Sequence, residues 1–98
     1  MQRKQARAPE RFEGGYPQID PSLINGAFAA LKQNLQKAME KHGGGVFASP
    51  YEGMGALLSE FNEYEKEVHN RDYERQCEEL LDVATVALVE YCSLQYAR

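Results

Sequence analysis

The stretch that decides the fold is residues 72–96, DYERQCEELLDVATVALVEYCSLQY. Its apolar residues recur every three or four positions, which is the spacing of one face of an α-helix. Valines extend the apolar surface around the helix, at Val83, Val86 and Val89. A helix that is apolar nearly all round is buried on more than one side. Because Asp72 is a good N-cap residue, we expect a helix over 73–96 that packs against more than one neighbour.

The most N-terminal of the expected helices begins and ends at clear local signals. Asp20 can act as its N-cap, and Pro21 suits the first helical position. Apolar residues then recur at helical spacing as far as Met39, while Lys37 and other polar residues occupy the other side. The glycines at 43–45 end the pattern, because glycine readily takes the left-handed cap conformation. The sequence therefore predicts a helix over about 21–42.

A capping box predicts the helix between these two. Ser49 is the N-cap, Pro50 follows it, and Glu52 can reach back to the start of the helix. The apolar stripe that follows predicts a helix over about 50–69, and its short connection to the next helix favours antiparallel packing. No stretch alternates with the period of a strand. The expected fold class is all-α, a three-helix antiparallel unit.

Length and charge limit what the chain can be. With 98 residues, 43% hydrophobic and 27% charged, it has the size and composition of one small globular domain. Its net charge of −4 is uneven, because residues 1–13 carry a net +2 and the rest a net −6. The acidic body repels a phosphate backbone, which argues against nucleic acid as a partner. We expect residues 1–19 to form a flexible basic arm and residues 20–98 to form the helical domain. In an alternative interpretation, Arg7 or Arg11 folds over a bound triphosphate.

The redox state expected of the two cysteines indicates the cellular compartment of the protein. Cys77 and Cys92 fall on the last expected helix, about 22 Å apart at 1.5 Å per residue. A disulfide requires Cα atoms within about 7 Å, so the two cannot pair within one chain. We expect inert, reduced thiols on or near the buried face of that helix. Reduced thiols, the lack of a signal-peptide pattern and the lack of a membrane-length apolar run favour a cytoplasmic protein with no membrane partner.

Two acidic pairs are the most informative feature. Glu60 and Glu63 lie three residues apart on one expected helix, and Glu79 and Asp82 lie three apart on the next. Residues three apart share a helix face, so antiparallel packing would bring four carboxylates together. Asp82 also lies in the most apolar stretch of the chain, where an unpaired carboxylate is costly. Mg²⁺ would offset that cost, and without it at least one carboxyl pKa should be raised. Since such pairs are frequent on helices by chance, a plain solvated face stays an open alternative.

Other charged residues near these acids are weaker candidates. Three basic residues could contact phosphate, although a solvated surface charge is the favoured interpretation of each, namely Lys66, Arg71 and Arg75. Glu67 continues the face of Glu60 and Glu63 by one turn and is a candidate for an outer acid. His42 and His69 lie near helix ends, and no second histidine or cysteine at ligand spacing indicates zinc.

The spacing of the acidic pairs resembles that of a known family. Glu60-Phe61-Asn62-Glu63, then fifteen residues, then Glu79-Leu80-Leu81-Asp82 resembles the ExxE…ExxD pattern of MazG-like nucleoside triphosphate pyrophosphohydrolases. The flanking residues Leu57-Leu58-Ser59 and Val83 are similar to the surroundings of the two motifs in that family. The similarity covers about residues 22–95.

The resemblance implies both an assembly and an activity. The family is all-α and homo-oligomeric, dimeric or tetrameric, with active sites at the subunit interface in a four-helix arrangement. By resemblance, Mg²⁺ (or Mn²⁺) binds to Glu60, Glu63, Glu79 and Asp82, and Glu60 or Glu63 orients the attacking water. The implied reaction is hydrolysis of a nucleoside triphosphate, deoxy and non-standard ones included, to a monophosphate and pyrophosphate. Many members continue into a fourth helix, so we expect this chain to dimerise into a four-helix-bundle-type core that covers the valines.

Two alternatives compete with this hydrolase. The first is a catalytically inactive helical dimerisation or regulatory module, whose carboxylates pair with lysines or arginines of a partner. The second is a nucleic-acid-associated protein that uses the basic arm. A response to Mg²⁺ distinguishes the hydrolase from the first, and a salt-dependent affinity that requires the arm would identify the second.

Overall fold

The computed structural model describes residues 16–97, which contain three α-helices and no strand. They are α1 (Pro21–His42), α2 (Pro50–Asn70) and α3 (Tyr73–Ala97). The prediction of an all-α chain with three helices is confirmed, and each boundary agrees with the expected one to within one residue. The arm predicted for residues 1–19 lies mostly outside the described residues.

Local capping explains where α1 begins and ends. The Asp20 carboxylate accepts a hydrogen bond from the backbone N–H of Ser22 at 2.8 Å, as expected of an N-cap. At the other end, Gly43 has a φ of 87°, and its N–H donates to the Met39 carbonyl oxygen at 2.8 Å. Because an L-residue is strained at such a φ, glycine at this position makes a clean helix end possible.

The predicted capping box opens α2. The Ser49 hydroxyl accepts from the Glu52 N–H at 3.2 Å. The Glu52 carboxylate reaches back to the N–H of Ala48, one residue ahead of the N–H that a standard capping box satisfies.

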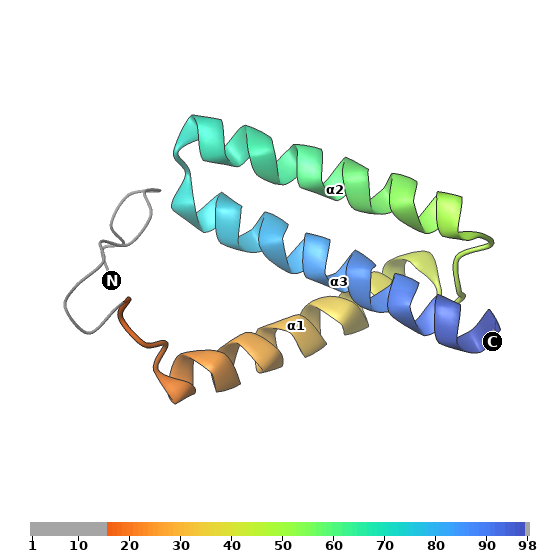
Figure 1. Ribbon diagram of the computed structural model, residues 1–98, viewed down its shortest axis with the longest axis horizontal. Helices are drawn as coiled ribbons and strands as arrows, with labels where there is room; N and C mark the ends of the chain where they lie inside the picture. The colour runs from red at the N-terminus through yellow and green to blue at the C-terminus, as the bar shows by residue number, and fades with distance from the viewer. Residues whose placement is uncertain (1–15, 98) are drawn as a thin grey trace.

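A tight connection joins α2 to α3. Arg71 takes the left-handed conformation with a φ of 58°, and Asp72 then caps α3 by accepting from the Arg75 N–H at 3.0 Å. The chain reverses within these two residues, so α2 and α3 lie antiparallel and side by side (Figure 1). This confirms the predicted antiparallel pair.

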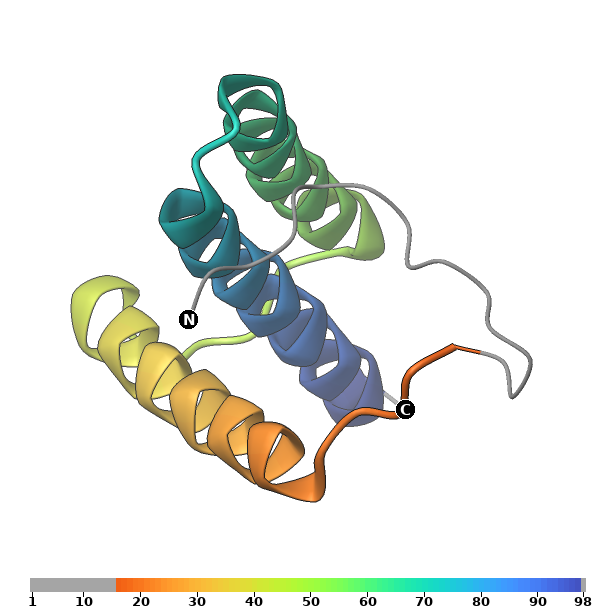
Figure 2. The same ribbon diagram turned by 90° about the vertical axis from the view of Figure 1, so that its left-hand side faces the viewer.

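α3 is the central helix. α2 packs along one side of it and α1 lies across another side, while α1 and α2 do not pack on each other (Figures 1 and 2). The Glu90 side chain of α3 lies against Gly53 of α2, where a Cβ would overlap its carboxylate. The loop before α2 is tied to α3 as well, since the Phe47 N–H donates to the Ser93 hydroxyl at 2.9 Å.

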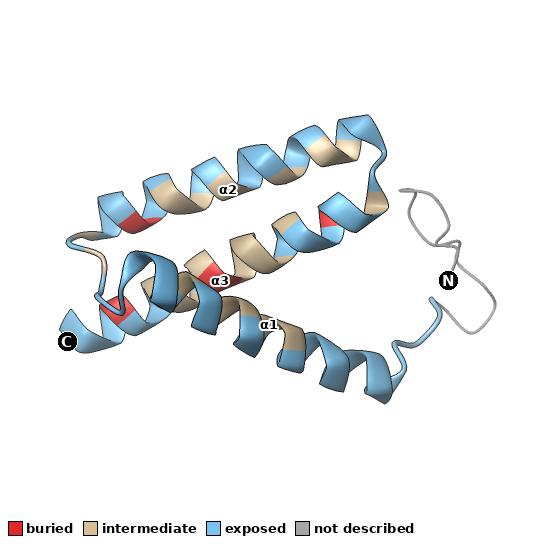
Figure 3. Cartoon of the chain, turned by 180° about the vertical axis from the view of Figure 1, so that it is seen from behind, coloured by how far each residue is buried: buried red, intermediate tan, exposed pale blue. Residues whose placement is uncertain are grey.

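The described residues contain no buried hydrophobic side chain (Figure 3). The buried residues on α3 are polar instead, namely Gln76, Thr85 and Ser93. Val83, Val86 and Val89 are half-buried, so the prediction that α3 is covered on more than one side is correct, but its third side faces solvent. One copy of the chain therefore lacks the apolar core that normally stabilises a domain.

Exposed apolar side chains lie on all three helices, and those on α2 and α3 form a pattern. On α2 they follow the spacing of three, four and three residues, which forms one stripe along a helix. On α3 they lie on the side opposite the residues that contact α1. We call this surface the apolar face, and its large members are Tyr51, Met54, Leu58, Phe61, Leu80, Tyr91 and Leu94. The single stripe expected on α2 is in fact two, because Leu57, Tyr64 and Val68 are half-buried against α3.

Candidate metal and phosphate site

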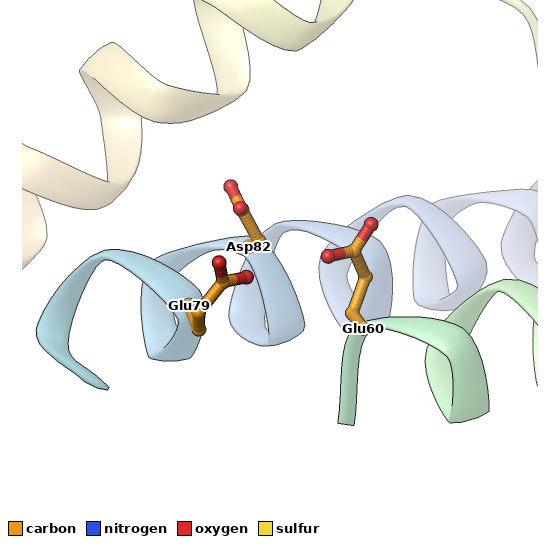
Figure 4. Close-up of side chains that lie close together, drawn as sticks. All are labelled: Glu60, Glu79 and Asp82. Carbon is orange, nitrogen blue, oxygen red and sulfur yellow. The ribbon is translucent and has the colours of Figure 1, made fainter. Parts of the chain in front are cut away.

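Three of the four predicted acids converge in the structure. Glu60 from α2 and Glu79 and Asp82 from α3 each place one carboxylate oxygen within 4.8 Å of the other two (Figure 4). All three are half-buried. The antiparallel contact of α2 with α3 produces this convergence, because it sets the acidic side of each helix beside that of the other. We call Glu60, Glu79 and Asp82 the acidic group.

Glu63 lies beside the acidic group and not within it. Its carboxylate is half-exposed and pairs with the Lys66 ammonium at 3.5 Å, one turn further along α2. Its charge nevertheless acts on the group, since it contributes to the raised pKa values of Glu60 and Glu79. Glu63 therefore occupies the rim of the site, and its role as a metal ligand stays a prediction.

Burial and like charges act together on two of these carboxyls. The pKa of Glu60 is raised, first by burial and then by the charges of Asp82 and Glu63, while His42 opposes the shift. The pKa of Glu79 is raised by burial and by the other acids, with Arg75 acting in the opposite direction. This agrees with the expectation that converging carboxylates without a cation hold their protons more tightly.

Asn34 of α1 fixes Asp82 from the other side. Its amide nitrogen lies 3.1 Å from Asp82 Oδ1, 2.8 Å from the Thr85 hydroxyl and 3.2 Å from the Leu81 carbonyl oxygen. An amide group has two hydrogens, so these three acceptors share them. The Oδ1 oxygen of Asp82 is thus engaged by α1.

A pocket of about 290 Å³ lies between α1 and the acidic group. Glu60 and Asp82 contribute its negative side, and Lys37, Lys41 and His42 line it from α1. Lys37 was expected on the polar side of its helix, and it is exposed, but it also lines this pocket. Asn34 was not among the expected site residues. The signal that could have identified these residues is their spacing, since positions 34, 37, 38, 41 and 42 share one helix face.

The predicted phosphate-contacting residues lie away from this pocket. Lys66 pairs with Glu63, and the Arg75 guanidinium lies 3.9 Å from the Glu67 carboxylate. Arg71 forms the left-handed turn between α2 and α3. None of these three lines the pocket. Their contact with phosphate stays a prediction.

The cysteines differ from expectation. Cys77 and Cys92 are both free, as expected, but both are exposed. They were expected on or near a buried face because α3 is so apolar, but one side of that helix has no cover within the chain. In the part of the chain that the structure describes, no helix combines the length and hydrophobicity needed to cross a membrane.

Comparison with known proteins found no matching family model, no matching curated protein and no matching solved structure. The similarity to MazG-like proteins therefore rests on the residues of the two motifs and on their spacing. The case for a function rests on the site itself.

Proposed function

We propose that this protein is a Mg²⁺-dependent nucleotide pyrophosphohydrolase that hydrolyses a nucleoside triphosphate to a monophosphate and pyrophosphate. The observation that carries the proposal is the convergence of the acidic group, from two helices, beside a pocket lined by cations. The resemblance of the two motifs supports the reaction class.

The donor set fits a hard divalent cation. Glu60, Glu79 and Asp82 offer only carboxylate oxygens, which Mg²⁺ prefers, and no histidine or cysteine belongs to the group. Three like charges within 4.8 Å repel each other, and a divalent cation would convert that repulsion into attraction. When bound, Mg²⁺ would neutralise phosphate charge and lower the pKa of a coordinated water. Mn²⁺ has the same preference for oxygen and could replace it.

The residues of the chain have distinct roles in this reaction. The acidic group would hold the cation, and Asn34 keeps Asp82 oriented by its hydrogen bond. In this proposal Glu60 or Glu63 would orient a water and accept its proton, and for Glu63 this requires its carboxylate to leave Lys66. The water oxygen attacks the α-phosphorus, and the bond from that phosphorus to the oxygen bridging to the β-phosphorus breaks. The monophosphate and pyrophosphate are the products.

The apolar face favours a homodimer. Fully burying a large apolar side chain contributes about 1.5–3 kcal/mol, so covering half-exposed side chains of this kind would contribute several kcal/mol. A second copy is the natural cover, because two antiparallel helices with matching stripes form half of a four-helix bundle. In the proposed assembly, the α2–α3 pairs of two copies form the core that one chain lacks.

Size-exclusion chromatography with light scattering tests this assembly. Leu58→Glu puts a charge at the centre of the α2 stripe and should shift the protein from dimer to a species of monomer mass, which should lose helix content by circular dichroism because one chain lacks an apolar core. Ser59→Glu, at the exposed neighbouring position outside the stripe, is the matched control and should remain dimeric. A monomeric wild type, or a Leu58→Glu variant as dimeric as Ser59→Glu, would contradict the proposed interface.

A non-catalytic dimerisation module is the second candidate, and the apolar face also supports it. The experiment that separates the two is pyrophosphate release from a panel of ribo- and deoxyribonucleoside triphosphates, with Mg²⁺ and with EDTA. The hydrolase predicts metal-dependent release with the monophosphate as co-product, abolished by Asp82→Asn in a protein whose helix content by circular dichroism is unchanged. A folded, dimeric protein that hydrolyses none of them would favour the module.

A further inference from the structure

The basic residues on the α1 side of the pocket have no role in holding a cation. Lys37, Lys41 and His42 line the pocket. Lys41 follows Lys37 by one turn of the helix, and His42 is the next residue. Asn34, one turn before Lys37, anchors this face of α1 to α3 through its bonds to Asp82 and Thr85. The backbone of this part of α1 is therefore fixed beside the acidic group, and the two exposed lysines project from it at the wall of the pocket.

Charges of both signs line this pocket, and its two lysines are not paired with its acids. Among the described residues, neither Lys37 nor Lys41 forms an ion pair, although Glu60 and Asp82 line the same pocket. A simple salt-bridge role would bring an ammonium to within 4 Å of a carboxylate. The separation suits a ligand that carries a cation at one end and negative charge at the other.

The end of a helix offers a simpler explanation for part of this set. Lys41 and His42 lie in the last turn of α1, where cations favour the negative end of the helix dipole. That effect is limited to the last turn. Lys37 lies before that turn, so the helix dipole does not account for its place on the pocket wall.

We propose that Lys37 and Lys41, with His42 beside them, bind the phosphate chain of a metal–polyphosphate ligand whose cation is held by the acidic group. This inference rests on the proposed function and adds to it the residues that bind the phosphates. Lysine is a common phosphate ligand in proteins, acting as a point charge. The cation would neutralise the acids and bridge them to phosphate oxygens, whose remaining charge faces the lysines.

The test is calorimetric binding of inorganic pyrophosphate to the full chain in the presence of Mg²⁺. Lys37→Gln and Lys41→Gln should each weaken the affinity by about tenfold, the loss typical of one charge-assisted hydrogen bond. The matched control is Lys32→Gln, an exposed lysine on the same helix that does not line the pocket. It should change the affinity less than twofold. Binding of Mg²⁺ alone should be unaffected in all three variants.

The outcomes separate this inference from the proposed function. Equal affinities for Lys37→Gln, Lys41→Gln and Lys32→Gln would overturn the inference even if the protein hydrolyses nucleotides. Lysine-dependent pyrophosphate binding in a protein that hydrolyses no triphosphate would uphold the inference and contradict the proposed function. No pyrophosphate binding in a protein that still binds Mg²⁺ would overturn the inference as well.

Discussion

Replacing Glu79 with glutamine should stabilise the protein in EDTA and reduce its response to magnesium. The substitution preserves shape and removes one of three charges whose oxygens lie within 4.8 Å of one another. Two unit charges at that distance repel by about 0.9 kcal/mol in bulk water. Glu79 has two such neighbours, Glu60 and Asp82, while the charge of Arg75 attracts it. After screening by solvent and salt, the net gain should be about 1 kcal/mol.

Magnesium should reverse the order of stability. At a Mg²⁺ concentration ten times its dissociation constant, binding stabilises the wild type by about 1.4 kcal/mol. The Glu79→Gln variant has lost a ligand and should gain much less. For a domain of this size, about 1 kcal/mol corresponds to a shift in melting temperature of about 4–8 °C. Both effects are therefore measurable by thermal or urea denaturation.

Glu78→Gln is the matched control, because Glu78 precedes Glu79 on α3 but is exposed and outside the acidic group. In EDTA it should be about as stable as the wild type, and Mg²⁺ should stabilise it fully. If Glu79→Gln were no more stable than Glu78→Gln in EDTA, the repulsion inferred from the geometry would be wrong. If Mg²⁺ stabilised both variants equally, Glu79 would not be a metal ligand.

Further expectations concern pH, backbone contacts and the support of the site. Because the pKa values of Glu60 and Glu79 are raised above 4.5 by folding, the unfolded state releases these protons first. The metal-free wild type should therefore lose stability as the pH rises above about 4.5, whereas the variant with both Glu60→Gln and Glu79→Gln should not lose it in this way. Urea denaturation at several pH values from 4 to 7 measures the difference. An alanine Cβ at position 55 meets nothing, so Gly55→Ala should stabilise α2 by about 0.8–1 kcal/mol. An alanine Cβ at position 53 would overlap the Glu90 carboxylate, so Gly53→Ala should not be stabilised, and thermal melts of the two variants compare them. Asn34→Leu removes the hydrogen-bond donor that orients the Asp82 carboxylate, and it should weaken the affinity for Mg²⁺ by about tenfold or more. Calorimetry measures this affinity, and an unchanged value would refute the role of Asn34.

The helix boundaries could be predicted because they depend on local chemistry. The N-cap contacts of Asp20, Ser49 and Asp72 involve residues two or three positions away, and Gly43 ends α1 by its own conformation. Such interactions are complete within a short stretch of sequence. The antiparallel pairing of α2 and α3 followed from the length of the connection between them.

The candidate site could be predicted in part for the same reason. Helix periodicity and antiparallel pairing together bring Glu60, Glu79 and Asp82 to one point. Periodicity does not determine the direction of a long side chain at the rim, and Glu63 turns toward Lys66. The contribution of α1 could not be predicted, because it depends on how that helix crosses α3. Asn34, whose bonds to α3 span more than 40 residues of sequence, fixes that crossing.

The expectation of a single apolar stripe on α2 was wrong. Periodicity identifies the apolar side of a helix but not the helix that packs against it. The stripe on α2 divides between Leu57, which faces α3, and Leu58, which is 54% exposed. On α3, Tyr91 is 60% exposed although it belongs to the most apolar segment of the chain. α1 and α2 each cover one side of α3 and do not contact each other. One side of α3 therefore has no cover within a single chain.

The acidic group and the apolar face lie on opposite sides of the α2–α3 pair, so their contributions to stability should be separable. Asp82 faces α1, to which Asn34 binds it, whereas the exposed stripe of α3 faces away from α1. Substitutions that share no partner usually add in their effects on the free energy of unfolding. Leu58→Glu should therefore abolish the dimer without changing the Mg²⁺ response of the remaining folded protein, and Glu79→Gln should do the reverse. Strong coupling in the double variant would instead place the metal site at the subunit interface, which is where the resemblance to MazG-like proteins puts it.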